Sequence, residues 1–65
     1  MKVSVNGEEQ IIASMSVYDF LLSIDCDPRP IAVELNCAIL AKKDYRTTFL
    51  LEGDQLEIVW FVGGG

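Results

Sequence analysis

Alternating apolar and polar residues open the chain, a pattern typical of a strand with one buried face. Val3 and Val5 share the apolar face of this first strand. Asn6-Gly7 follows, and this pair favours a type I′ turn because both central residues of such a turn need a positive φ. Residues 8–12 are predicted to form the returning strand. The start of the chain therefore predicts a β-hairpin.

In the next segment, apolar residues recur at the spacing of a helix and no longer alternate with polar residues. Four apolar residues recur at this spacing and form the expected buried stripe of a helix: Val17, Phe20, Leu21 and Ile24. Ser16 is the predicted N-cap, and Asp19 completes a capping-box-like arrangement at the positive end of the helix. The helix should end before Pro28, because the residue preceding a proline is disfavoured in the helical region.

Alternation returns in the second half of the chain. Residues 31–36 predict a strand, residues 37–40 a short strand or irregular piece, and residues 41–48 have room for one helical turn. Acidic residues and glycine at 52–54 predict a turn before a last strand at 55–62. This order predicts an α+β fold in which a mixed sheet packs on one main helix. A last strand beside the first would close the sheet in the β-grasp, or ubiquitin-like, arrangement.

The last predicted strand divides its side chains between two faces. One face carries Leu56, Ile58, Trp60 and Val62. If that face packs under the helix, Val59 and Phe61 point away from the core, and an exposed apolar pair there indicates a docking patch. The candidate partner-binding residues are Val59, Phe61 and Val62. The alternative is a strand covered on both faces or twisted at its end, since scattered surface hydrophobes are normal.

The net charge of the chain makes some classes of binding partner less suitable than others. The 65 residues include 10 acidic and 5 basic side chains, a net charge of −5, which argues against sequence-independent nucleic-acid binding. An acidic surface suits a partner with a basic one. Lys42, Lys43 and Arg46 lie in one short stretch, either as a solvated loop face or as a partner contact.

Neither a signal peptide nor a membrane-spanning run is present, so we expect a cytoplasmic location and no membrane partner.

Two cysteines offer little chemistry. Cys26 and Cys37 are too few for a disulfide framework, and without histidine they cannot complete a zinc site or hold a common iron–sulfur cluster. We expect ordinary packing or a surface thiol for each, with a mutual disulfide as the alternative. We therefore expect no bound metal and no bound cofactor.

The whole chain resembles the small sulfur carrier proteins of thiamine biosynthesis. The resemblance rests on VNG near the start, LN and IL in the middle, EGDQLEI after them, and a closing diglycine. Three places depart from the family's pattern. Ala41-Lys42 stands where a proline and a basic residue are frequent, Tyr45 where tryptophan is frequent, and Gly63 where a larger residue is usual.

This resemblance implies a protein substrate with a reactive end, not an enzyme. An adenylating, E1-like enzyme would use ATP and magnesium to convert the Gly65 carboxylate to an acyl adenylate. A sulfur donor, such as a persulfide on a cysteine desulfurase, would displace AMP and leave a thiocarboxylate. Thiazole synthase would then take this sulfur into the thiazole ring of thiamine.

The glycine tail suits such chemistry on physical grounds. A C-terminal carboxylate has a pKa of about 3.3–3.7, so it is an unreactive anion at neutral pH and needs activation. The chain has no histidine and no phosphate loop, so the activating groups belong to a partner. Gly64 lacks a Cβ and can enter a narrow channel, while Gly63 adds reach. Residues 1–62 are thus the predicted domain, and residues 63–65 a flexible tail.

Two other functions fit the same pattern. The small subunit of molybdopterin synthase also carries sulfur on a terminal diglycine, although such subunits are usually longer. A ubiquitin-like interaction domain, or a protein modifier, would share the fold without sulfur chemistry. An extra residue after Gly65 separates these classes, because a plain interaction domain should tolerate it and a carrier should not.

Overall fold

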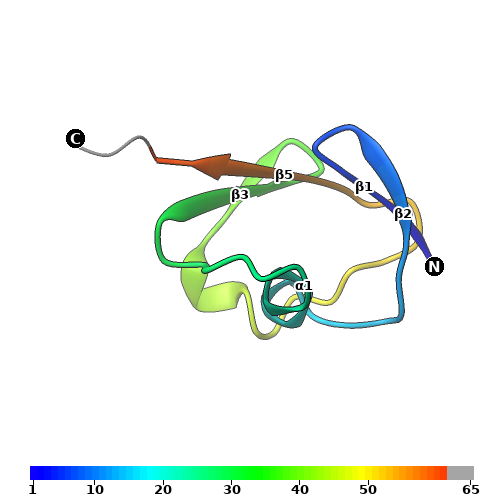
Figure 1. The fold of residues 1–65 in the computed structure, drawn as a ribbon, viewed down its shortest axis with the longest axis horizontal. Coiled ribbons are helices and arrows are strands. Elements are labelled where there is room, and N and C mark those ends of the chain that lie inside the picture. Colours follow the sequence, from blue (N-terminus) through cyan, green and yellow to red (C-terminus); the bar gives the residue numbers. More distant parts are fainter. Residues whose placement is uncertain (62–65) are drawn as a thin grey trace.

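The computed structural model describes residues 1–61 and shows an α+β fold with one five-stranded sheet (Figure 1). The elements in chain order are β1 (Lys2–Val5), β2 (Glu8–Ile11), α1 (Val17–Ser23), β3 (Ile31–Leu35), β4 (Ala38–Leu40), the 3₁₀ turn η1 (Lys42–Asp44) and β5 (Gln55–Trp60). The strand order is β2-β1-β5-β3-β4. Only β1 and β5 are parallel, so the sheet is mixed, and α1 covers one face. This is the predicted β-grasp arrangement.

The first hairpin turns at the predicted residues. Asn6 and Gly7 have φ angles of 49° and 84°, and Val5 pairs with Glu8 directly across the turn. The Asn6 side chain also reaches the central strand. Its Oδ1 accepts from the Ile58 amide at 2.6 Å, and its Nδ2 donates to the Ile58 carbonyl at 3.2 Å. The turn residue thus extends the pairing of β1 with β5 beyond the end of β1.

The helix begins as predicted and ends early. The Ser16 side chain accepts a hydrogen bond from the Asp19 amide at 3.0 Å, which caps the first turn. Three of the four predicted stripe residues are buried, but Ile24 is 41% exposed. The helix ends at Ser23, and the chain then turns at Asp25, whose φ is 57°. Cys26, the residue after this turn, is buried, and its amide donates to the Leu21 carbonyl.

The core lies between α1 and the covered face of the sheet. The strands supply Val3, Val5, Ile31, Val33, Leu56 and Ile58, all buried. The long connection after η1 closes the remaining side with Tyr45 and Leu50, which are 2% and 0% exposed. The connection between η1 and β5 therefore contributes to the core, although η1 itself has no buried residue.

The number of strands that pair with the central strand β5 changes along its length. At its start, it pairs with β1 through Gln55 and Leu56. On its other side it pairs with β3 as far as the Ile31–Trp60 register. Of the strand face that would pack under the helix, Leu56 and Ile58 are buried, but Trp60 is 55% exposed. Here β5 has run past the end of β1, so only one neighbouring strand remains.

The two cysteines are free in the structure. Cys26 is buried and Cys37 is exposed, so the predicted packing and surface thiol are confirmed and the disulfide alternative is not. Among residues 1–61, no helix has the length and hydropathy needed to cross a membrane.

Candidate functional site

The end of β5 leads directly into the predicted reactive tail. Four predicted site residues, Val62, Gly63, Gly64 and Gly65, lie outside the residues that the structure describes. The predicted domain boundary after residue 62 falls there as well. What the structure does place is the strand that carries the tail and the surface around its last residues.

Apolar side chains are exposed at this end of the strand. Val59, Trp60 and Phe61 are 47%, 55% and 61% exposed, so three consecutive apolar residues meet solvent. Val59 lies opposite Ala32 on the sheet face away from the core. The Phe61 amide donates to the Pro30 carbonyl at 3.0 Å, which anchors the last described residue. Val59 and Phe61 are exposed as expected, but Trp60 between them is exposed too, so burial does not alternate at this end of the strand. The docking role of Val59 and Phe61 stays a prediction.

Two carboxylates lie side by side on the same outer face. Glu57 of β5 pairs in register with Glu34 of β3, which in turn lies opposite Ile39 of β4. Like charges directly opposite each other on neighbouring strands are destabilising. Neither glutamate takes part in an ion pair among residues 1–61. This face therefore combines exposed apolar residues with uncompensated negative charge, which complements a basic partner surface.

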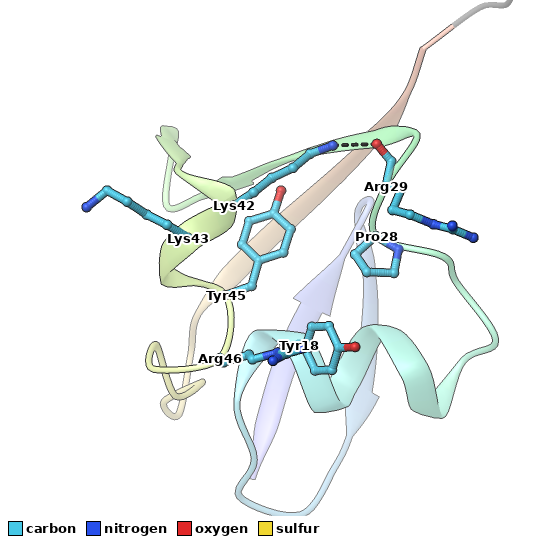
Figure 2. Close-up of a pocket in the computed structure, with 7 residues that line it drawn as sticks. All are labelled: Tyr18, Pro28, Arg29, Lys42, Lys43, Tyr45 and Arg46. Atoms are coloured by element: carbon cyan, nitrogen blue, oxygen red, sulfur yellow. Dashed lines mark hydrogen bonds between the residues drawn. The ribbon is translucent and has the colours of Figure 1, made fainter.

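A second feature, a basic groove, lies around η1 (Figure 2). Its volume is about 590 Å³, and it is lined by four basic side chains and two tyrosines: Arg29, Lys42, Lys43, Arg46, Tyr18 and Tyr45. The Lys42 ammonium lies 5.9 Å from the centre of the Phe61 ring. The groove and the base of the tail are thus joined by one side chain.

One wall of the groove is stiffened by an ion pair. Arg29 binds both carboxylate oxygens of Asp27, at distances between 2.6 and 3.1 Å. Hydrogen bonds from the Arg29 side chain and backbone lower the pKa of Asp27 to about 2. The aspartate is therefore an anion at all physiological pH values, and it neutralises this arginine.

No group of catalytic character stands out in the described chain. Burial, and then the nearby charge of Asp27, raise the pKa of the Cys26 thiol, so this thiol stays protonated and unreactive. Residues 1–61 contain no cluster of three or more potential metal ligands. The site is a surface and a chain end, and its chemistry depends on what binds there.

The sequence does not predict the groove as a single site. The stretch from Lys42 to Arg46 was noted, and its clustering is confirmed. Arg29, Pro28 and Tyr18 come from the preceding loop and from α1, and no spacing in the sequence connects them with that stretch. Only the packing of the loop beside η1 brings them together.

A mixed sheet on one helix, with an exposed apolar strand end that leads into glycines, defines a ubiquitin-like β-grasp domain of the carrier class. Comparison with known families is more specific. The profile of the ThiS family matches residues 3–65. The chain belongs to the ThiS family, whose members include sulfur carrier proteins of thiamine biosynthesis.

Individual relatives agree with this membership. A thiazole synthase of Paramagnetospirillum magneticum is 46% identical over 66 residues, which cover 100% of this chain and 20% of that protein. The chain thus spans about a fifth of the length of this relative. The sulfur carrier protein ThiS of Bacillus subtilis is 38% identical over 50 residues, covering 77% of this chain and 76% of that protein.

A solved structure has the same fold. The crystal structure of the thiamine biosynthesis protein ThiS from Geobacter metallireducens superimposes with a TM-score of 0.86 at 29% identity. The alignment covers 100% of both chains. The predicted family and fold are therefore confirmed together.

Proposed function

We propose that this chain carries sulfur as a thiocarboxylate on Gly65 and donates it for formation of the thiamine thiazole ring. The observation that carries the proposal is the match to the ThiS family, which runs to residue 65 and so includes the glycine tail. In the sequence in hand Gly65 is the last residue, and the proposal requires its carboxylate to be free in the cell.

The relatives favour the thiazole pathway over the synthesis of molybdopterin. Proteins of Paramagnetospirillum magneticum and Magnetococcus marinus that contain a segment similar to this chain are both called thiazole synthase. A carrier segment within such a protein would hold the sulfur source beside its consumer. We propose that the present chain meets a thiazole synthase as a separate partner, which leaves the Gly65 carboxylate free for activation.

The proposed chemistry begins with activation of an unreactive anion. An adenylating enzyme transfers AMP from ATP to the Gly65 carboxylate, with release of pyrophosphate and with magnesium stabilising the phosphate charge. A persulfide on a donor such as a cysteine desulfurase attacks the carbonyl carbon through its terminal sulfur and expels AMP. A thiol then cleaves the sulfur–sulfur bond and leaves the thiocarboxylate on Gly65.

The domain contributes position and access to this chemistry. Strand β5 is hydrogen-bonded along β3 as far as Trp60, so the tail starts from a fixed point. Gly64 has no Cβ and can pass a narrow channel towards a nucleotide in the partner. We propose that Val59 and Phe61, together with Val62, form the surface against which the adenylating enzyme docks, while that enzyme supplies ATP and magnesium.

Mass spectrometry of the terminal peptide tests this proposal. The chain is incubated with the adenylating enzyme of the thiamine pathway, ATP, magnesium and a persulfide donor, and then alkylated. We expect one sulfur in place of oxygen at Gly65, and an alkyl group on that sulfur. Alkylation is needed because replacement of oxygen by sulfur has the nominal mass change of an ordinary oxidation.

Two tail variants give the control. Deletion of Gly65, or addition of one alanine after it, should abolish sulfur loading and leave the fold intact, because the carboxylate no longer reaches the activating site. Loading of the extended variant would refute the mechanism. Failure of the unaltered chain, with a known carrier loaded in parallel, would instead favour a molybdopterin or interaction role.

A further inference from the structure

The basic groove has a charge opposite to that of the molecule as a whole. Four of the chain's five basic side chains line it, although the chain has 10 acidic residues and a net charge of −5. No carboxylate of the described residues is among those that form its walls. A surface of this kind attracts a negatively charged ligand to one place on an otherwise acidic molecule.

Two of the basic side chains in the groove have no carboxylate partner. The other three basic residues of the chain are paired, as Lys2–Glu9 at 3.8 Å, Arg29–Asp27 at 2.6 Å and Lys43–Asp44 at 3.7 Å. Lys42 and Arg46 form no ion pair within residues 1–61. The unpaired cationic side chains of the described residues therefore both lie in this groove.

Both unpaired cations are held in place by other contacts. The Arg46 guanidinium stacks on Tyr18, 4.3 Å from the ring centre, which leaves its N–H edge free for a planar acceptor. The Lys42 side chain spans one end of the groove and donates to the Arg29 carbonyl on the opposite wall (Figure 2). This strap also contacts the Phe61 ring.

A buried hydroxyl supplies an independent sign of a ligand. Tyr45 lines the groove, is only 2% exposed, and its hydroxyl has no hydrogen-bond partner among residues 1–61. The Val33 backbone lies near it without forming a hydrogen bond of ordinary geometry. Buried hydroxyl groups are nearly always hydrogen-bonded, so this one marks a place for an acceptor that the free chain lacks.

From these features we propose that the groove binds an acidic peptide segment of a protein partner. One carboxylate of the peptide forms an ion pair with the free N–H edge of Arg46. A second carboxylate pairs with the Lys42 ammonium, which then no longer donates to the Arg29 carbonyl. The Tyr45 hydroxyl then donates to the bound segment. The groove is open and its cations are separated, an arrangement that suits several carboxylates on one chain better than a single small anion.

The groove also adjoins the base of the tail through the contact of Lys42 with Phe61. A partner that holds the tail can therefore fill the groove at the same time. The proposed peptide binding itself requires no adenylation and no sulfur, so it can be tested even if the proposed function fails.

Titration with a model peptide tests the inference. The full chain, labelled with ¹⁵N, is titrated at low salt with a blocked hexaglutamate peptide, and amide shifts are followed by NMR. We expect shifts confined to the amides of Tyr18, Arg29 and residues 42–46. The double variant Lys42→Gln with Arg46→Gln should bind about 10-fold more weakly, because two charge-assisted contacts are lost.

Lys2→Gln is the matched control, because it removes an exposed cation outside the groove. It should change the affinity by less than about two-fold. Equal weakening by this control, the absence of binding to hexaglutamate, or equal binding of a hexaglutamine peptide would overturn the proposal. Identical shifts with inorganic phosphate would replace the peptide site by a small-anion site.

The spectra also report whether each variant is folded. If the double variant is unfolded, Arg46→Lys provides the second test, since it keeps the charge but loses the planar fork. Weaker peptide binding is expected for this variant, and unchanged binding would contradict the assigned role of Arg46.

Discussion

Several single residues have specific structural roles in this small domain. Asn6 forms a turn with its backbone and a continuation of the sheet with its amide side chain. Lys42 joins the basic groove to the base of the tail. Tyr45 fills the core with its ring and leaves its hydroxyl without a partner. Each of these roles depends on one atom or group at the end of a side chain.

Tyr45→Phe tests the unpaired hydroxyl. Since a buried, unsatisfied hydroxyl costs about 1–3 kcal/mol, we expect its removal to raise the free energy of unfolding by up to about 1 kcal/mol, measured by urea denaturation. A loss of stability would show that the hydroxyl is hydrogen-bonded in solution.

The same residue predicts a dependence on pH. Burial raises the pKa of Tyr45, so the unfolded chain releases this proton at about pH 10 while the folded chain retains it. The unfolded state then binds fewer protons, and stability should fall as the pH rises above about 10. This part of the fall should be absent from the Tyr45→Phe variant.

Among the elements, β5 contributes both to the core and to the exposed surface. It lies at the centre of the sheet, its start is held on both sides, and its end projects past β1 with exposed side chains on both faces. One element therefore changes from buried core to exposed apolar surface within a few residues. The like-charged pair Glu57–Glu34 lies on its outer face, between these two parts.

Replacement of Glu57 by glutamine tests this pair. We expect the free energy of unfolding to rise by about 0.2–1 kcal/mol at low salt, because a cross-strand repulsion is removed. Glu8→Gln, which changes the net charge equally at an exposed position of β2, should have a smaller effect. A gain of the same size from both variants would assign the effect to net charge alone.

For the molecule as a whole, two surfaces meet at the base of the tail. The outer sheet face presents Val59 with uncompensated glutamates, while Phe61 follows the end of β5 and lies near Lys42 of the basic groove. Opposite charges on adjacent surfaces define the orientation of a partner better than one patch does. Such an orientation is what transfer to a chain end requires.

Phe61→Asp separates docking from folding. We expect the affinity for the proposed adenylating partner, measured by calorimetry, to fall by about 10-fold or more, because an apolar contact is replaced by a charge. The free energy of unfolding should change by less than about 1 kcal/mol, since the side chain is exposed and contacts Lys42. Ile11→Asp is the matched control at another exposed apolar residue. A large loss of stability would place Phe61 in the packing of the domain.

The sequence by itself determined those features that depend on near neighbours along the chain. Asn6-Gly7 predicted the hairpin and Ser16 the helix cap, because turn and cap geometry depend on a few adjacent residues. Alternation separated Leu56 and Ile58 from Val59 and Phe61, and the whole pattern identified the family.

Only the tertiary structure decided where each element loses its neighbours. Trp60 is exposed because β1 ends earlier, and Ile24 because the helix stops at Ser23. The groove exists because Arg29 and Arg46, distant in sequence, are brought together by packing of two connections. Burial and shared surfaces are properties of contacts between distant segments, and a local pattern contains no record of those contacts.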